Sequence, residues 1–244
     1  VAGSVTVGVA NITAGSFTVT EDGIISASGR GYLKGYGPNF EGGSLPQLKN
    51  GWDGGRHGGV GGQAKEALYL DNDSPYGDAR FPTEMGAGGG SRNNKGGRGG
   101  GIVWIRSKTV QMDGVIQANG DDTTLNDGAG AGAGGTIFVA GDTLRGEGTF
   151  LANGGHCTAS SNSDGYRAGG GSGGRIAAIF TVEIDFAASR MQAYGGDTAV
   201  SGTRGDRPGS GGTVHEYSPD RDIVRSSVDA IKGGYLVTGG IQLI

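Results

Sequence analysis

The chain contains little of what several fold classes require. A single cysteine, Cys157, cannot form an internal disulfide framework. Aromatic residues make up 7% and apolar residues 34% of the 244 residues, which predicts a thin hydrophobic core. No apolar stretch approaches the roughly 18 residues that a membrane-spanning helix needs. We therefore expect no membrane insertion, and we expect Cys157 to be a free thiol rather than a bridge between subunits.

An excess of charge of one sign is also missing. The chain has 20 basic and 24 acidic residues without long runs, and its net charge is −4. A nucleic-acid-binding surface would show in the sequence as a cluster of basic residues. The composition therefore predicts no nucleic-acid partner.

Glycine is the abundant residue, with 56 copies against roughly 7% of residues in ordinary proteins. Glycine clusters followed at once by apolar runs recur after Gly101, Gly135, Gly174 and Gly212, at intervals of 34, 39 and 38 residues. About fifteen residues after each of the first three openings, a second strand-like phrase ends in alanine and glycine (115–120, 150–155 and 191–196). This regular return of apolar phrases predicts a folded repeat protein rather than a disordered chain.

The repeats predict an all-β fold, specifically a parallel β-solenoid (β-helix-like) with glycine-rich, polyproline-II-like side layers. Short alternating runs of β-branched residues favour strands, and no amphipathic helical window occurs before residue 218. Glycine segments have no Cβ and can lie close together as extended strands. Stacked units would form ladders of equivalent core residues, which we expect to be Ile102, Ile137 and Ile176 in one ladder and Ala118, Ala152 and Ala193 in another.

The composition divides this single repeat domain, residues 1–244, into four segments. They are the N-terminal strands (1–29), a long glycine-rich excursion (30–100), the repeats (101–217) and the C-terminal strands (218–244).

Residues 50–217 resemble large secreted or surface glycine-rich repeat proteins of bacteria and plants. The resemblance rests on the phrases Gly169 to Ile176 and Phe150 to Gly155, and on the upstream phrases 57–62 and 82–90. A weaker similarity exists to phage tail-tip adhesins that are built on polyglycine-II layers. The resemblance implies an extracellular or cell-surface β-solenoid, and it supplies no catalytic residues to transfer.

We expect a non-catalytic structural module that associates with itself into a fibre or a cell-surface assembly. No catalytic constellation stands out in the sequence, and alternating apolar strands occur near both ends, where unpaired β edges invite pairing. The expected assembly residues are Val5, Val7 and Val9 in one strand region and Ile241 and Leu243 in the other.

Two alternative functions follow from other residues. A carbohydrate-binding adhesin tip would use Trp52, Tyr76 and Tyr166 to stack on surface glycans. A polysaccharide lyase or hydrolase would need carboxylates gathered on one face, and Asp113, Glu147 and Asp185 fall near equivalent turns.

One further group of residues offers oxygen ligands. Asp71, Asp73 and Asp78 cluster in a way that Ca²⁺ would accept, although the full calcium-loop pattern is missing. Turn formation by the same aspartates is the simpler interpretation. We expect no other cofactor.

Overall fold

The computed structural model describes residues 1–38, 53–62, 74–90, 96–123, 129–157, 168–198 and 208–226. Within these ranges the regular structure is almost entirely β-strand, and the one helical segment is the short 3₁₀ turn η1 (Ala188–Arg190). The predicted all-β class is therefore confirmed.

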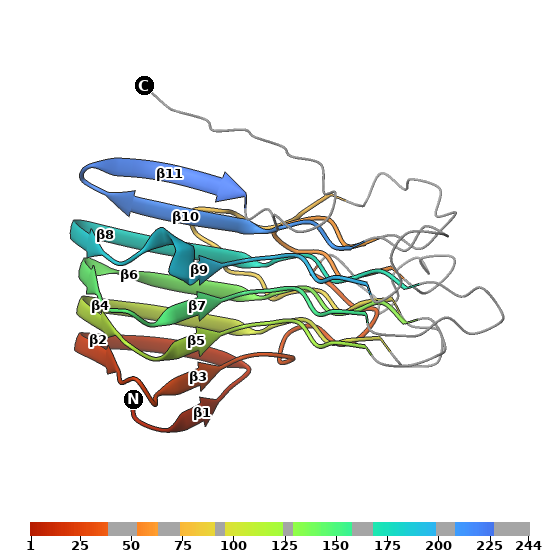
Figure 1. Ribbon diagram of the computed structural model, residues 1–244, viewed down its shortest axis with the longest axis horizontal. Coiled ribbons are helices and arrows are strands. Elements are labelled where there is room, and N and C mark those ends of the chain that lie inside the picture. The colour runs from red at the N-terminus through yellow and green to blue at the C-terminus, as the bar shows by residue number, and fades with distance from the viewer. Residues whose placement is uncertain are drawn as a thin grey trace.

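The strands form two sheets, which Figure 1 shows side by side. The five-stranded sheet has the order β1-β3-β5-β7-β9, and all its neighbours are parallel. The six-stranded sheet has the order β11-β10-β8-β6-β4-β2, and only its β10–β11 pair is antiparallel. The short strands are β1 (Ser4–Thr6), β3 (Ile24–Ser26), β5 (Val115–Gln117), β7 (Thr149–Leu151) and β9 (Met191–Gln192). The longer strands are β2 (Val9–Val19), β4 (Ile102–Met112), β6 (Thr136–Arg145), β8 (Arg175–Asp185), β10 (Thr213–Ser218) and β11 (Arg221–Ser226).

The chain alternates between the two sheets, and the repeat spacing sets the register. Ile102 pairs with Thr136, Thr136 with Arg175, and Arg175 with Thr213. Each of these residues directly follows the last glycine of its opening phrase, so the predicted intervals of 34, 39 and 38 residues are confirmed.

The predicted isoleucine ladder is wrong by one residue in its first member. Ile137 and Ile176 are register partners, but their partner in β4 is Val103, and Ile102 faces outward. The opening phrase of β4 has three consecutive apolar positions before Ile105, so hydrophobicity alone does not decide which of them faces the core. Counting from the last glycine of each phrase gives the observed register.

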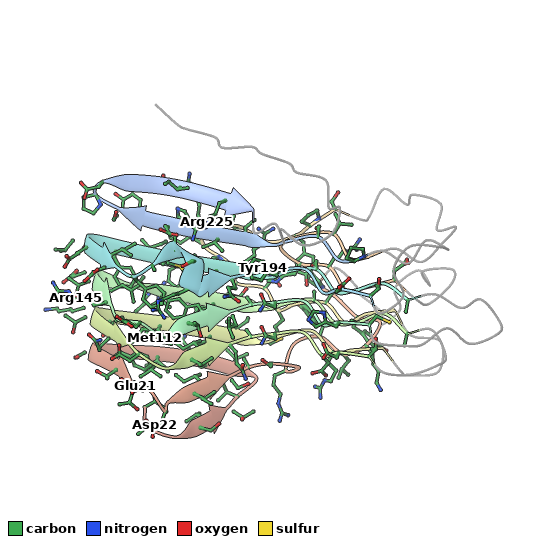
Figure 2. All side chains as sticks on the ribbon, viewed as in Figure 1. Glu21, Asp22, Met112, Arg145, Tyr194 and Arg225 are labelled. Atoms are coloured by element: carbon green, nitrogen blue, oxygen red, sulfur yellow. The ribbon has the colours of Figure 1, made fainter. Side chains whose placement is uncertain are left out.

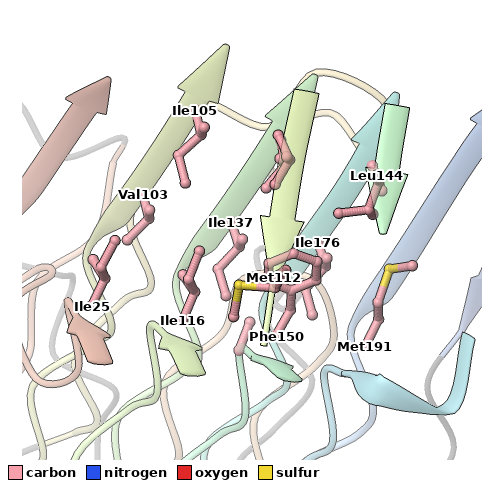
Figure 3. Close-up of a cluster of buried hydrophobic side chains, with 14 of the residues drawn as sticks. Ile25, Val103, Ile105, Met112, Ile116, Ile137, Leu144, Phe150, Ile176 and Met191 are labelled. Atoms are coloured by element: carbon pink, nitrogen blue, oxygen red, sulfur yellow. The ribbon is translucent and has the colours of Figure 1, made fainter. Parts of the chain in front are cut away.

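The hydrophobic core lies between the sheets, as Figure 3 shows. Alternate residues of β2, β4, β6, β8 and β10 contribute to it because successive side chains of a strand face opposite sides. The alanine ladder forms as predicted: Ala118, Ala152 and Ala193 are fully buried, and backbone hydrogen bonds run from Ala118 to Leu151 and from Ala152 to Gln192. The largest fully buried apolar side chains are Phe150, Phe180, Ile25, Ile105, Met112, Ile116, Ile137, Leu144 and Ile176.

Beyond the strands, glycine-rich segments lie against one another in what we call the glycine layer, on the right of Figure 1. In its central segment, 129–135, the backbone N–H groups follow a period of three. Gly130 and Ala133 donate to segment 86–90, Ala131 and Gly134 donate to segment 168–174, and Gly132 and Gly135 donate to segment 118–121. The layer comprises segments 30–36, 53–62, 86–90, 96–101, 118–123, 129–135, 152–157, 168–174, 193–198 and 208–212.

The same central segment accepts hydrogen bonds from three further neighbours. Gly97 and Gly100 donate to Gly130 and Ala133, Gly55 donates to Ala131, and Gly155 donates to Gly132. Segment 129–135 is thus surrounded by six others, and their peptide groups bond in several directions rather than in the plane of a sheet. The expected packing of excursion 30–100 on itself is present in its described parts, for example in the bonds from Gly86 to Gly100 and from Gly89 to Gly97.

One segment leaves the glycine layer and crosses the outer face of the six-stranded sheet; we call residues 74–85 the strap. The indole N–H of Trp104 donates to Pro82 O at 2.8 Å, and Thr136 Oγ1 donates to Glu84 O at 2.6 Å. The Arg175 guanidinium donates to Tyr76 O at 2.7 and 2.9 Å. Strands β4, β6 and β8 therefore all hold the strap.

Candidate functional site

The end of the sheets that carries β1 and β2 has open strand edges. Within the described residues β1 pairs only with β3. In a parallel strand the N–H and C=O of one residue point to the same neighbour, and those of the next residue point to the opposite side. Gly3 O and Val7 N bond to β3, so the peptide groups of Ser4 and Thr6 point to the open side.

The neighbouring strand β2 is open in the same direction. In the described part of the chain β4 is the strand that pairs with it, and Gly8 O accepts the N–H of Ile102. Near the other end of β2 the Val1 ammonium donates to Thr18 O, so the open part of the edge is the part that begins at Val9. The peptide groups of Val9, Asn11 and Thr13 therefore point away from β4. Both sheets end at this side of the molecule in rows of N–H and C=O groups that can accept another strand.

Apolar side chains accompany these edges. Val5 is 43% exposed and Val9 is 55% exposed, whereas Val7 is partly buried against the core. Of the three valines predicted for assembly, two are therefore available to a partner and one is a packing residue. Glu21 and Asp22 lie at the same end, as Figure 2 shows.

The opposite end of the six-stranded sheet differs, because the antiparallel strand β11 folds back over β10. Arg225 pairs with the buried carboxylate of Glu216 and donates to Ala188 O, which joins β11 to β10 and to η1. Arg80 of the strap reaches Asp222 of β11, with 2.6 Å between Nη1 and Oδ2. Residues Ile241 and Leu243, also predicted for assembly, lie outside the described residues.

The Asp222 carboxylate is the electrostatic centre of this end, where β11 is the last strand of its sheet. The buried His215 side chain donates from Nε2 to Asp222 Oδ1 at 2.9 Å. This hydrogen bond, together with the charge of Arg80, holds the pKa of Asp222 below its usual range. The carboxylate therefore stays ionised and joins the strap to the β10–β11 hairpin.

Of the predicted calcium ligands, Asp78 alone lies in the described residues. Its Oδ1 accepts the backbone N–H groups of Arg80 at 2.6 Å and Phe81 at 2.9 Å. These bonds lower the pKa of Asp78, with the Phe81 N–H contributing most. The carboxylate thus performs the turn-forming role, and the described ranges contain no group of three residues of the types that bind metals.

Of the predicted sugar-stacking residues, Tyr76 alone is described. Its ring lies 4.9 Å from the imidazole of His57, and its hydroxyl donates to Met85 O at 2.6 Å. Burial raises the pKa of this phenol well above its usual value. Tyr76 therefore packs the strap onto the glycine layer, and Trp52 and Tyr166 lie outside the described residues.

The three carboxylates considered for catalysis each have partners along the stack. Asp113 accepts from the side-chain amide of Gln111 and from the backbone N–H of Glu147. Glu147 pairs with Arg190, at 3.5 Å. Asp185 lies opposite Arg145 in the register of β6 and β8. They occupy successive turns and interact with neighbouring residues along the stack.

The thiol and one histidine are buried. Cys157 is a free cysteine that is 3% exposed, with Sγ 3.9 Å from Ala129 O, and this burial opposes a bridge to another subunit. His57 is fully buried in the glycine layer with Nδ1 2.8 Å from Gly134 O. Burial, which disfavours the charged imidazolium, lowers the pKa of His57 to about 3.

An aromatic cluster on the outer face of the six-stranded sheet escaped prediction. Trp104 stacks on Phe138 with ring centroids 4.3 Å apart, and Phe81 of the strap lies 6.2 Å from Phe138. Trp104 and Phe138 occupy the same position of successive repeats, three residues after the last glycine of each phrase. That equivalence was a signal for the Trp104–Phe138 stack, but nothing in the sequence placed Phe81 beside it.

Comparisons of the chain with protein-family models, with curated proteins and with solved structures found no match. In the described part of the chain, no helix has the length and apolar character needed to cross a membrane.

Proposed function

We propose that the chain is a non-catalytic structural module that assembles end to end with further copies of itself through the open edges of β1 and β2. The observation that carries this proposal is that both sheets end, on the same side, in edges with exposed valines. Natural proteins usually protect such edges with charges, prolines, bulges or covering segments, because an open edge is a template for another strand. In β1 and β2 every side chain that faces solvent is uncharged.

We further propose that the two sheets and the glycine layer together form a short parallel β-solenoid. The sheets supply two sides of each coil, and glycine segments in a polyproline-II-like conformation supply the third. The period of three in the hydrogen bonds of segment 129–135 supports this, because polyproline II has three residues per turn. In such a stack a second copy would add further coils along the axis of the solenoid.

An extracellular or cell-surface location is part of this proposal and rests on the resemblance of residues 50–217 to secreted glycine-rich repeat proteins. A self-associating module of this kind would lengthen and stiffen a surface structure and would not catalyse a reaction.

The test removes the hydrogen-bond donors of the open edges without disturbing the sheets. In the variant Thr6→Pro/Asn11→Pro, both lost N–H groups point away from the neighbouring strand, and proline is tolerated on edge strands. Sedimentation velocity of the full chain over a concentration series should show oligomers for the wild type and monomers for the variant.

Val182→Lys provides the matched control, since Val182 is 62% exposed on β8, away from both edges. Its oligomeric state should equal that of the wild type. A wild-type chain that stays monomeric at every concentration, or assemblies that persist in the double-proline variant, would refute assembly through these edges.

A further inference from the structure

The outer face of the six-stranded sheet carries a fixed aromatic cluster beside exposed cations. Phe81 is 58% exposed, and its ring packs against that of Phe138, which is buried. The Arg106 guanidinium carbon lies 4.7 Å from the Trp104 ring centroid and 5.9 Å from that of Phe138. Because the Trp104 indole N–H is bonded to Pro82 O in the strap, the cluster is held in place before any ligand arrives.

Two positive charges stand in line with Trp104 along β4. Arg106 and Lys108 are both exposed, and neither has a carboxylate partner within the described residues. Along a strand, residues i and i+2 face the same side and lie about 7 Å apart. Trp104 and Arg106 therefore lie about 7 Å apart, and Lys108 ends this row of one ring and two cations at the point where the alternation of β4 breaks, since Lys108 and Thr109 are both exposed.

The β2 side of this row carries no charge, whereas on the β6 side the exposed Asp142 lies at the level of Lys108, where its Oδ1 accepts from Thr181 Oγ1. Arg106 has Thr13 of β2 on one side and Ala140 of β6 on the other. Gly15 lies in β2 at the level of Lys108, and a Cβ built there meets no atom within 4 Å. An extended chain can thus lie along β4 and reach both cations.

We propose that this row binds an acidic polysaccharide, with Phe81 stacking on a sugar ring while Arg106 and Lys108 bind the carboxylates of uronate residues. Aromatic side chains give a flat apolar surface that suits the face of a sugar ring. Guanidinium–carboxylate hydrogen bonds are among the stronger polar contacts in proteins. Unpaired cations beside an aromatic surface select an anionic glycan over a neutral one.

The charge of the molecule favours a glycan over a nucleic acid. Nucleic-acid binding depends on many phosphate contacts, whereas this row offers two cations on a chain of net charge −4. The proposal is independent of self-assembly, because the row lies on the outer face of β4 and the assembly edges belong to β1 and β2.

Isothermal titration calorimetry of the full chain with an oligogalacturonate tests this assignment. Arg106→Gln/Lys108→Gln should weaken binding at least about tenfold, and Phe81→Ala should weaken it by a similar factor. A neutral oligogalactoside of the same length should bind far more weakly than the oligogalacturonate. Raised salt should weaken oligogalacturonate binding, since the cations are exposed.

Two controls separate this site from general attraction between charges. Arg30→Gln/Arg145→Gln removes the same charge at exposed positions elsewhere and should leave affinity unchanged, as should Tyr217→Ala on the same face. Thermal melts of all variants establish that they are folded. Absence of binding by the wild type, equal loss in the charge-matched control, or equally tight binding of single-stranded DNA would overturn the proposal.

Discussion

The two halves of this molecule are stabilised by different parts of the chain. In the sheets, side chains fill the space: Phe150, Phe180 and Met112 are fully buried between two β-layers. In the glycine layer, backbones fill the space, and segment 129–135 bonds through its peptide groups to six neighbours. A core of side chains tolerates changes of similar volume, whereas a core of backbones has no side-chain volume to exchange. The halves should therefore respond to opposite kinds of substitution.

Removing a large side chain from the sheet half should have the greatest effect. Phe150→Ala deletes a fully buried ring that lies 5.1 Å from Phe186, and we expect the free energy of unfolding to fall by about 3–5 kcal/mol. Urea denaturation followed by circular dichroism measures this change. Leu151→Ala, one residue along the same strand but facing outward, should cost much less; equal costs would contradict a core between the sheets.

Adding a single methyl group to the glycine half should be almost as damaging. A Cβ at Gly134 would lie 2.0 Å from Ala152 O and 2.6 Å from Gly174 N, so two backbones would have to move. We expect Gly134→Ala to destabilise the fold by about 3 kcal/mol, the upper part of the usual range for overpacking. The same denaturation experiment measures it.

Gly15→Ala is the matched control for that substitution. A Cβ at Gly15 meets nothing within 4 Å, and the residue lies in the extended strand β2. The substitution should be neutral or should stabilise the fold by about 0.5 kcal/mol through a less flexible unfolded chain. Similar losses at Gly15 and Gly134 would show that close backbone packing does not explain the glycine content.

The fold of the sheet half could be predicted from the sequence more completely than that of the glycine half. Alternation in β4, β6 and β8 and the fixed intervals between glycine phrases led to parallel pairing and to most of the register. The glycine phrases themselves are interchangeable as sequences, so which segment bonds to which could not be predicted. Peptide groups carry no residue-specific signal, and six-neighbour packing depends on contacts between segments as distant as Gly55 and Ala131.

The candidate site was predicted less completely than the fold. Val5 and Val9 were predicted from the alternation of apolar residues in 4–9, and both are exposed, whereas their role in assembly stays a prediction. Tyr76 was predicted to stack on glycans, and its contacts with His57 and Met85 O result from the strap crossing three strands, which the sequence did not indicate. The same crossing places Phe81 beside Phe138, a contact between residues more than fifty positions apart.

Acidification should weaken the junction where the glycine half meets the strap. His57 is neutral in the folded protein with a pKa of about 3, whereas an unfolded histidine titrates near 6.5. Between these values the unfolded chain binds more protons, so the free energy of unfolding falls as pH falls. From pH 7 to pH 5 the loss should be about 2 kcal/mol. Denaturation curves at several pH values measure it.

His57→Gln separates this contribution from those of other titrating groups. Glutamine can donate to Gly134 O through its amide but does not titrate, so the variant should lose most of the dependence between pH 7 and pH 5. An unchanged slope would mean that the buried imidazole is not the group responsible.

The smallest expected effect lies where the five-stranded sheet passes into the glycine layer. There an asparagine side chain of one repeat accepts a backbone N–H of the next repeat: Asn153 N donates to Asn119 Oδ1 and Tyr194 N donates to Asn153 Oδ1, both at 2.8 Å. Asn153→Ala leaves the Tyr194 N–H without its acceptor and should cost about 1 kcal/mol. Gln192→Ala, a neighbouring amide that is partly exposed, should cost less. If the two variants melt at the same temperature, the asparagine ladder adds nothing, and the alanine ladder beneath it alone joins the two halves of the molecule.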